Sequence, residues 1–152
     1  PIYETLIEMK KLGIFIEITN LIVPEVGDSI EDLRKLVRWI IENLGDEIPF
    51  HVLRFHPDYQ MTKYPPTPVP TLEKAAKVAL EEGLKYVYIG NVPGHKLEHT
   101  YCPECKTVLV KRFGFDILEW NLTENMTCPK CVYRVNIKGR RYYSRSLWAA
   151  LI

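Results

Sequence analysis

Residues 14–44 have the sequence IFIEITNLIVPEVGDSIEDLRKLVRWIIENL, in which a strand pattern passes directly into a helix pattern. The first ten residues are rich in β-branched side chains and form an almost unbroken apolar run, which is typical of a strand buried on both faces. Pro24 ends this strand. Ser29 and Asp32 have the spacing of a capping box, and apolar residues then recur at helical intervals up to Gly45. The stretch predicts one βα unit.

Further strands and helices continue this alternation. Strands are predicted at residues 49–55 and 86–89, and a helix between them, capped by Thr71, ends at Gly83. Another helix, ending at Lys11, precedes the first strand. A proline-rich loop follows the second strand; its prolines are Pro57, Pro65, Pro66, Pro68 and Pro70. Strands alternating with helices predict parallel pairing through right-handed crossovers, as in a barrel or an open α/β sheet.

The chain does not start with methionine. Pro1 is its first residue, and a helical pattern is already under way by Tyr3. Three strands leave open edges on both sides of a sheet, which an N-terminal half of the same protein or another chain would cover. We therefore expect a fragment of a longer protein, with removal of an initiator methionine as the alternative.

Composition predicts one ordinary domain core with a small appended module. The chain has 152 residues, of which 47% are hydrophobic, and a net charge of +1. Its apolar runs are far shorter than the roughly 20 residues that cross a bilayer, and it shows no charged-then-apolar leader. These features predict a soluble, cytoplasmic protein without a membrane partner.

The charge balance changes near Gly90. Residues 1–101 contain 11 basic and 15 acidic side chains, a balance of −4, whereas residues 102–152 contain 9 and 4, a balance of +5. We therefore predict two modules, residues 1–95 and residues 96–152.

The second module contains two C-x-x-C pairs with 22 residues between them. The four cysteines are Cys102, Cys105, Cys128 and Cys131. Two residues between ligands let a tight turn bring both thiolates about 3.5–4 Å apart, and two such turns complete a tetrahedron around Zn²⁺. Residues 107–112 and 117–122 are predicted to form the short strands of a zinc ribbon. Because four cysteines leave no coordination position open, the zinc is predicted to be structural.

Two alternatives to zinc stay open. Four thiolates also bind iron, and C-x-x-C pairs occur in redox proteins, although a thioredoxin-like pair opens a helix and needs only two cysteines. One departure from zinc knuckles is that Lys106 and Val132, rather than glycine, follow the second cysteine of each pair.

Polar residues mark the carboxyl ends of the predicted strands, where α/β folds bind ligands. The first strand carries Thr19 and Asn20, the second runs into Arg54 and His56, and a glycine-flanked turn follows the third. Because side chains alternate along a strand, Arg54 and His56 are predicted to point the same way, into a barrel. A histidine bonded to its own loop is the alternative for His56. The pattern predicts a binding rim and matches no nucleophile triad, P-loop or Rossmann fingerprint.

The order of motifs along nearly the whole chain resembles one enzyme family. The motifs are EITNLIVP at residues 17–24, RFHPDY at residues 54–59, PPTP at residues 65–68, YVYIGNVPGH at residues 86–95 and YCPEC at residues 101–105. They resemble the C-terminal half of the AmmeMemoRadiSam-system radical S-adenosylmethionine enzymes, which are relatives of pyruvate formate-lyase activating enzyme.

The resemblance implies C-terminal βα units of a partial (β/α)6 radical S-adenosylmethionine barrel, followed by a zinc-ribbon module. The barrel of the intact enzyme would hold S-adenosylmethionine and a [4Fe–4S] cluster. The family's cluster motif, C-x-x-x-C-x-x-C, is absent from this chain, and the four cysteines have a different spacing. The chain is therefore expected to supply the last barrel strands and to be inactive alone. The implied reaction of the intact protein is reductive cleavage of S-adenosylmethionine to methionine and a 5′-deoxyadenosyl radical, which abstracts hydrogen from a substrate. Pyruvate formate-lyase is not adopted as that substrate, because it rests on analogy alone.

The resemblance also implies cofactor contacts. It places Thr19, Asn20 and His56 where late strands contact S-adenosylmethionine. The activating enzymes usually have arginine at the position of Thr19, and Arg54 could supply that charge to the methionine carboxylate. A Memo-like or AmmeMemo-type protein is the partner that the resemblance suggests.

A binding module is the competing hypothesis. The end of the chain is basic, with tyrosines among the charges, which would contact phosphates and stack on bases of RNA. These residues are Lys138, Arg140, Arg141, Tyr142, Tyr143 and Arg145. A solvated basic tail is the alternative, and the modest charge of +5 over 51 residues favours it over RNA binding. Leu147, Trp148 and Leu151 would alternatively give a helix an apolar face for a protein partner.

Overall fold

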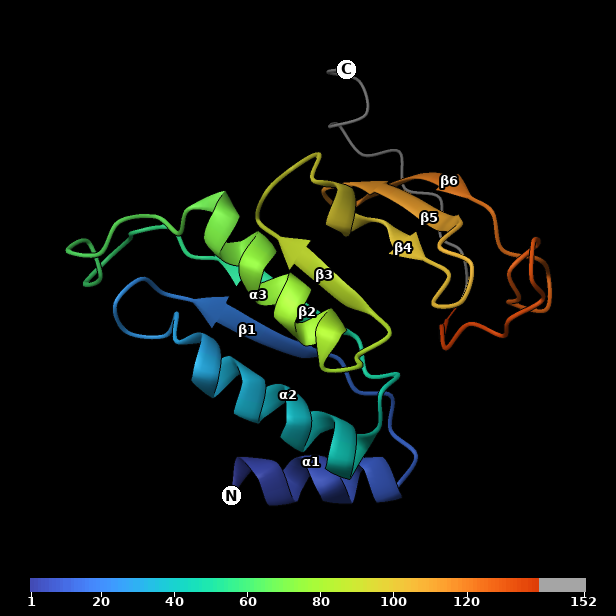
Figure 1. The fold of residues 1–152 in the computed structure, drawn as a ribbon, viewed down its shortest axis with the longest axis horizontal. Coiled ribbons are helices and arrows are strands. Elements are labelled where there is room, and N and C mark those ends of the chain that lie inside the picture. Colours follow the sequence, from blue (N-terminus) through green and yellow to red (C-terminus); the bar gives the residue numbers. More distant parts are fainter. Residues whose placement is uncertain (140–152) are drawn as a thin grey trace. The chain divides into compact units, whose positions relative to one another are not determined.

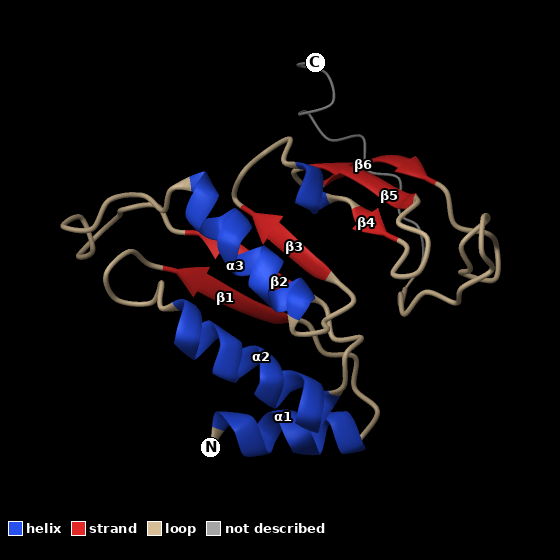
Figure 2. Ribbon diagram, in the orientation of Figure 1, coloured by secondary structure: helices blue, strands red, loops and turns tan. Residues whose placement is uncertain are grey.

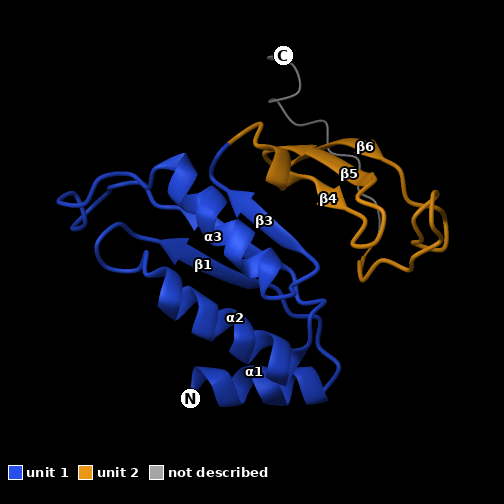
Figure 3. Cartoon of the chain, in the orientation of Figure 1, with its two compact units in different colours: residues 1–92 blue, residues 93–152 orange. Residues whose placement is uncertain are grey.

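The computed structural model describes residues 1–139 of the chain. The chain forms two compact units, of which the first comprises Pro1–Val92 and the second begins at Pro93 (Figure 3). The predicted module boundary, between residues 95 and 96, lies three residues further along. Each unit has its own sheet, and each is described by itself.

Helices and strands alternate in the first unit (Figure 1). Its elements are α1 (Ile2–Lys11), β1 (Ile18–Ile22), α2 (Ile30–Leu44), β2 (Phe50–Arg54), α3 (Val69–Glu81) and β3 (Val87–Gly90). The three strands are parallel and lie in the order β1-β2-β3. The prediction of parallel strands in sequence order is therefore confirmed.

The helix α2 begins and ends where the sequence predicts. The Ser29 hydroxyl caps it by accepting a hydrogen bond from the Asp32 N–H (3.3 Å), and Gly45 follows its last residue with φ 98°. Its buried residues are Leu33, Val37, Ile40 and Leu44. Because these residues recur at helical spacing, they form one apolar stripe that faces the interior of the unit.

The helix α3 begins two residues before its predicted cap. Pro68 is the N-cap and Val69 the first helical residue, so the prediction that Thr71 caps this helix is wrong. Proline suits the first turn because its missing N–H would have no helical partner there, and Pro70 lies in that turn. Thr71 is an interior residue of the first turn, and its N–H donates to the Pro68 carbonyl (3.0 Å).

The two faces of the parallel sheet differ. On one face, Phe50 and Val52 of β2 are fully buried, whereas Thr19 and Leu21 of β1 are exposed on the other, and Leu21 keeps 46% of its accessible surface. We call these the covered face and the open face. The prediction of a first strand buried on both faces is therefore wrong for this chain, and β1 is limited to Ile18–Ile22.

The second unit contains a small antiparallel sheet (Figure 2). Its elements are the 3-10 helix η1 (Lys96–Glu98) and the strands β4 (Thr100–Tyr101), β5 (Val108–Phe113) and β6 (Asp116–Trp120), in the sheet order β4-β5-β6. The predicted short strands correspond to β5 and β6. Leu109 and Val110 are fully buried and form the centre of this unit. Within residues 1–139, no helix is long and apolar enough to cross a bilayer.

Candidate metal centre and a hollow at the strand ends

The four cysteines of the second unit lie together. Their Sγ atoms are all within 4.8 Å of one another, with 3.4 Å between those of Cys102 and Cys131 and 3.5 Å between those of Cys105 and Cys128. A tetrahedral Zn²⁺ ion with Zn–S bonds of about 2.3 Å separates its sulfur ligands by about 3.8 Å. The cluster therefore fits a metal ion such as zinc.

Both cysteine pairs adopt the same turn. In each, the residue after the second cysteine donates its N–H to the carbonyl of the first, from Lys106 to Cys102 (3.0 Å) and from Val132 to Cys128 (3.0 Å). Lys106 and Val132 have φ angles of 59° and 63°. This left-handed conformation is the one that glycine adopts at no steric cost. The missing glycines therefore leave the turn intact and add local strain.

The sulfur atoms affect one another's ionisation. The Thr107 hydroxyl, 3.2 Å from Cys105 Sγ, and the Thr107 N–H lower the pKa of the Cys105 thiol to about 6. The Tyr133 N–H favours the Cys131 thiolate, but burial and the other three cysteines outweigh it and raise the pKa of Cys131 to about 12. One ionised sulfur thus opposes ionisation of its neighbours. A divalent cation removes that opposition by supplying positive charge to all four.

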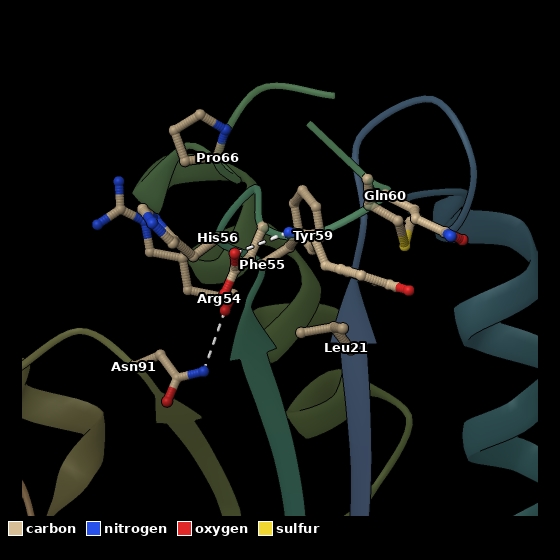
Figure 4. Close-up of a pocket in the computed structure, with 10 residues that line it drawn as sticks. Leu21, Arg54, Phe55, His56, Tyr59, Gln60, Pro66 and Asn91 are labelled. Atoms are coloured by element: carbon tan, nitrogen blue, oxygen red, sulfur yellow. Dashed lines mark hydrogen bonds between the residues drawn. The ribbon is translucent and has the colours of Figure 1, made fainter. Parts of the chain in front are cut away.

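A hollow lies at the carboxyl ends of the strands of the first unit (Figure 4). Its volume is about 1040 Å³, near the upper end of the roughly 300–1,000 Å³ typical of small-molecule sites. Its lining includes Leu21 of β1 and Arg54, the last residue of β2, together with His56 and Asn91, which follow the ends of β2 and β3. The segment that follows β2 supplies the rest of the lining, namely Phe55, Asp58, Tyr59, Gln60, Met61 and Pro66.

Arg54 and His56 lie on the same side of β2, next to Pro66, in Figure 4. Arg54 follows the fully buried Phe50 and Val52 at even spacing, so it belongs to the covered face. Its Nε atom donates to the Thr67 carbonyl (3.0 Å). The two side chains thus point the same way, as predicted. They point toward the loop before α3, however, whereas the interior of a barrel would lie on the open face, so the prediction that they point into a barrel is wrong.

Thr19 and Asn20 lie on opposite faces of β1. Thr19 pairs in register with His51 and is exposed on the open face, whereas Asn20 pairs with Val52 on the covered face. Neither residue lines the hollow. Of the four predicted cofactor-binding residues, the structure therefore brings Arg54 and His56 together at the hollow and leaves Thr19 and Asn20 apart from it.

Asn91 and Thr67 hold the strand ends in place at this edge, and the local sequence does not predict either role. The Asn91 side-chain amide donates to the Arg54 carbonyl (3.1 Å), and Asn91 has φ 62°, a conformation that asparagine tolerates. Thr67 is fully buried in the proline-rich loop and bonds to the ends of both β1 and β2. The PPTP motif marks the loop, but nothing in it reveals these distant partners.

A polar row crosses the open face. His51 Nε2 lies 3.0 Å from Glu17 Oε2, and the His51 ring stacks on the Tyr88 ring at a centroid distance of 5.0 Å. The side chains of Glu17 and His51 keep 52% and 27% of their accessible surface. Together with Thr19, the row presents hydrogen-bonding groups rather than an apolar layer.

Most residues predicted to contact RNA or a protein partner, from Arg140 to Leu151, lie outside the described residues. Lys138 is described and is exposed. The proposed RNA and partner contacts therefore stay predictions.

No protein-family model matches the chain. The chain is similar to the uncharacterized protein MJ0808 of Methanocaldococcus jannaschii, with 51% identity over 138 residues. The alignment covers 90% of this chain and 41% of the relative, so the chain spans less than half of the length of the curated protein that it matches.

Proposed function

We propose that this chain forms the last strands and part of the cofactor pocket of a radical S-adenosylmethionine enzyme, and that its four cysteines bind a structural zinc ion. The observation that carries the first part is the hollow at the carboxyl edge of the parallel sheet, with Arg54 and His56 in its lining. Ligands of α/β folds bind at this edge. The motif series along the chain supplies the identity of the cofactor.

The sheet of the first unit has features expected for part of a larger barrel. Its outer strands, β1 and β3, each leave one edge unpaired among residues 1–139, and edges of parallel sheets are normally covered. The open face carries Glu17, His51 and Tyr88 beside the apolar Leu21, which keeps 46% of its accessible surface. A partial (β/α)6 barrel would pair both edges and turn the open face inward.

In the intact protein, the [4Fe–4S] cluster would be held by a part outside this chain, and this chain would contribute contacts to S-adenosylmethionine. All four cysteines of this chain lie in one group, so the chain has no further thiolate for a [4Fe–4S] cluster. The chemistry that the bound cluster and S-adenosylmethionine supply is reductive cleavage to methionine and a 5′-deoxyadenosyl radical. Arg54 would bind the methionine carboxylate at the hollow beyond the strand ends, on the rim of the barrel rather than in its interior, and through its Nη atoms, because Nε is held by Thr67. His56 would donate a second hydrogen bond to the same molecule.

Four thiolates saturate a tetrahedral ion, so the proposed zinc has no position for a substrate or a water molecule. It would contribute folding free energy to a unit with few buried apolar residues. The purified chain should contain about one zinc, with Zn–S distances near 2.3 Å by X-ray absorption. A stoichiometric iron content, or two disulfides without metal, would contradict the proposal.

The intact gene product tests the enzyme proposal. Its sequence should contain C-x-x-x-C-x-x-C before the region of this chain, and the anaerobically reconstituted protein should bind a [4Fe–4S] cluster whose electron paramagnetic resonance spectrum changes when S-adenosylmethionine is added. Absence of that motif would exclude the radical mechanism.

A further inference from the structure

Thr67 connects the ends of two strands. Its side chain is fully buried, and within residues 1–139 only Thr67 and Thr100 are buried polar or charged residues. The Thr67 hydroxyl donates to the Ile22 carbonyl (2.5 Å) and accepts from the Phe55 N–H (2.9 Å). The Thr67 N–H donates to the Phe55 carbonyl (3.2 Å). One buried residue therefore ties the end of β1 to the end of β2.

The segments that Thr67 joins are those that line the hollow. Leu21, Arg54 and Pro66 are lining residues, and each immediately precedes a residue that takes part in these hydrogen bonds. Thr67 itself lies behind the lining. A change in its position would therefore move three parts of the wall together.

Thr67 also holds Arg54 directly. The Arg54 Nε donates to the Thr67 carbonyl (3.0 Å), which leaves the two Nη atoms for a ligand. Pro66 and Pro68 flank Thr67 and restrict the backbone of the loop. With the loop stiff, the direction of the Thr67 carbonyl depends on the hydrogen bonds of its hydroxyl. The guanidinium direction follows from that carbonyl.

We infer that Thr67 is a positioning residue of the cofactor pocket, and that it sets the direction in which Arg54 presents its guanidinium to the carboxylate of S-adenosylmethionine. The identity of the ligand rests on the proposed function, whereas the placement of Arg54 by Thr67 does not. A threonine with only a structural role would change folding and would leave the affinity for the cofactor unaltered in the folded protein.

Kinetics of the intact protein separate these roles. Thr67→Val keeps the shape of the side chain but leaves the Phe55 N–H and the Ile22 carbonyl without their partner. The KM for S-adenosylmethionine in deoxyadenosine formation should rise about 10-fold with kcat within about twofold, as expected when one hydrogen-bonded contact of the bound ligand is lost. Thr67→Ser should restore the original KM.

A double-mutant cycle tests whether Thr67 acts through Arg54. In an Arg54→Gln background, Thr67→Val should add no further increase in KM, because the group that it positions is already absent. Additive effects of the two changes would overturn the inference, as would a loss confined to kcat.

A second measurement needs no turnover, and its wild-type comparison needs no variant. In the wild-type chain, the Arg54 Nε–H should exchange with water at least about 10-fold more slowly than that of the exposed Arg134, measured by NMR with ¹⁵N-labelled arginine. Thr67→Val should abolish this protection, whereas the matched control Thr100→Val in the second unit should retain it. Equal exchange at Arg54 and Arg134 would overturn the inference. If the intact wild-type protein does not cleave S-adenosylmethionine, the proposed function fails, and this exchange measurement still decides whether Thr67 positions Arg54.

Discussion

Lys106 and Val132 hold backbone conformations that most residues avoid. Both follow the second cysteine of a pair, and both have φ near +60°. For a β-branched residue such as Val132 this conformation is especially unfavourable, since it crowds the Cβ atom against the following carbonyl. Val132 is 74% exposed and gains little from packing. The strain at this position is therefore not offset by burial.

Val132→Gly should stabilise the zinc-loaded chain. Glycine adopts φ 63° without strain, although it loses more entropy on folding, so the net gain should be about 0.5–1 kcal/mol, or a rise of a few degrees in Tm. Asn125→Gly is the matched control, because Asn125 is exposed in the same unit and does not have a positive φ. It should destabilise slightly. A fall in Tm for Val132→Gly would show that the strain argument is wrong.

We expect Thr107 to affect the pH at which the proposed metal centre loses its zinc. Its hydroxyl and N–H lower the pKa of Cys105 to about 6 from an ordinary value of 9.0. A lowered pKa favours the thiolate form of Cys105, which is the form that binds a metal ion. The stabilisation by Thr107 is therefore fully present above pH 9.0 and is lost as the pH falls through about 6. Thr107→Val should raise the pKa and move zinc loss to a higher pH, by roughly half a unit. Acid titration with a zinc indicator measures this, with Thr71→Val in the first unit as a control that should leave the midpoint unchanged.

At the scale of the elements, the starts of α2 and α3 are specified in different ways. Ser29 caps α2 with its side chain, whereas α3 has no side-chain cap and starts at Pro68 and Val69. The sequence offers a hydroxyl residue near the start of each helix, Ser29 for α2 and Thr71 for α3. Only the structure shows that Ser29 is a cap and that Thr71 is not.

Ser29→Ala should therefore destabilise the first unit by about 1 kcal/mol, the usual cost of losing an N-cap. Thr71→Ala should cost clearly less, because Thr71 does not cap its helix. Chemical denaturation of both variants checks this pair. Equal losses would mean that Thr71 does contribute at the start of α3.

Local sequence predicts those features of the fold that depend on local spacing. The two C-x-x-C pairs, the stripe of α2 and the parallel order of β1, β2 and β3 follow from periodicity and ligand chemistry. Thr67 could not be predicted, because its hydroxyl bonds residues 45 and 12 positions away. The placement of Arg54 likewise depends on a loop whose path the sequence does not specify. Thr19 and Asn20 are different: strand alternation already requires that neighbours face opposite sides.

At the scale of the whole molecule, the two units have separate cores. The first contains the helices α1, α2 and α3, and the second depends on a small sheet and the cysteine cluster. A unit whose ligands must be brought together by a metal loses much of its folding free energy when the metal is removed.

Chelation should therefore unfold the second unit and leave the first folded. We expect a zinc chelator to change the fluorescence and near-ultraviolet signals of Trp120, which lies in β6, while the helical circular dichroism signal at 222 nm keeps most of its amplitude. Returning zinc should reverse the change. Loss of the helical signal in parallel would show that the first unit depends on the metal as well.

The most direct test of the central proposal is deoxyadenosine formation from S-adenosylmethionine with a chemical reductant, compared between the intact protein and this chain alone. The intact, cluster-loaded protein should form deoxyadenosine, its His56→Ala variant should form it more slowly or bind the cofactor more weakly while keeping its zinc, and the chain alone should form none. No deoxyadenosine from the intact protein, or turnover by the chain alone, would contradict the account.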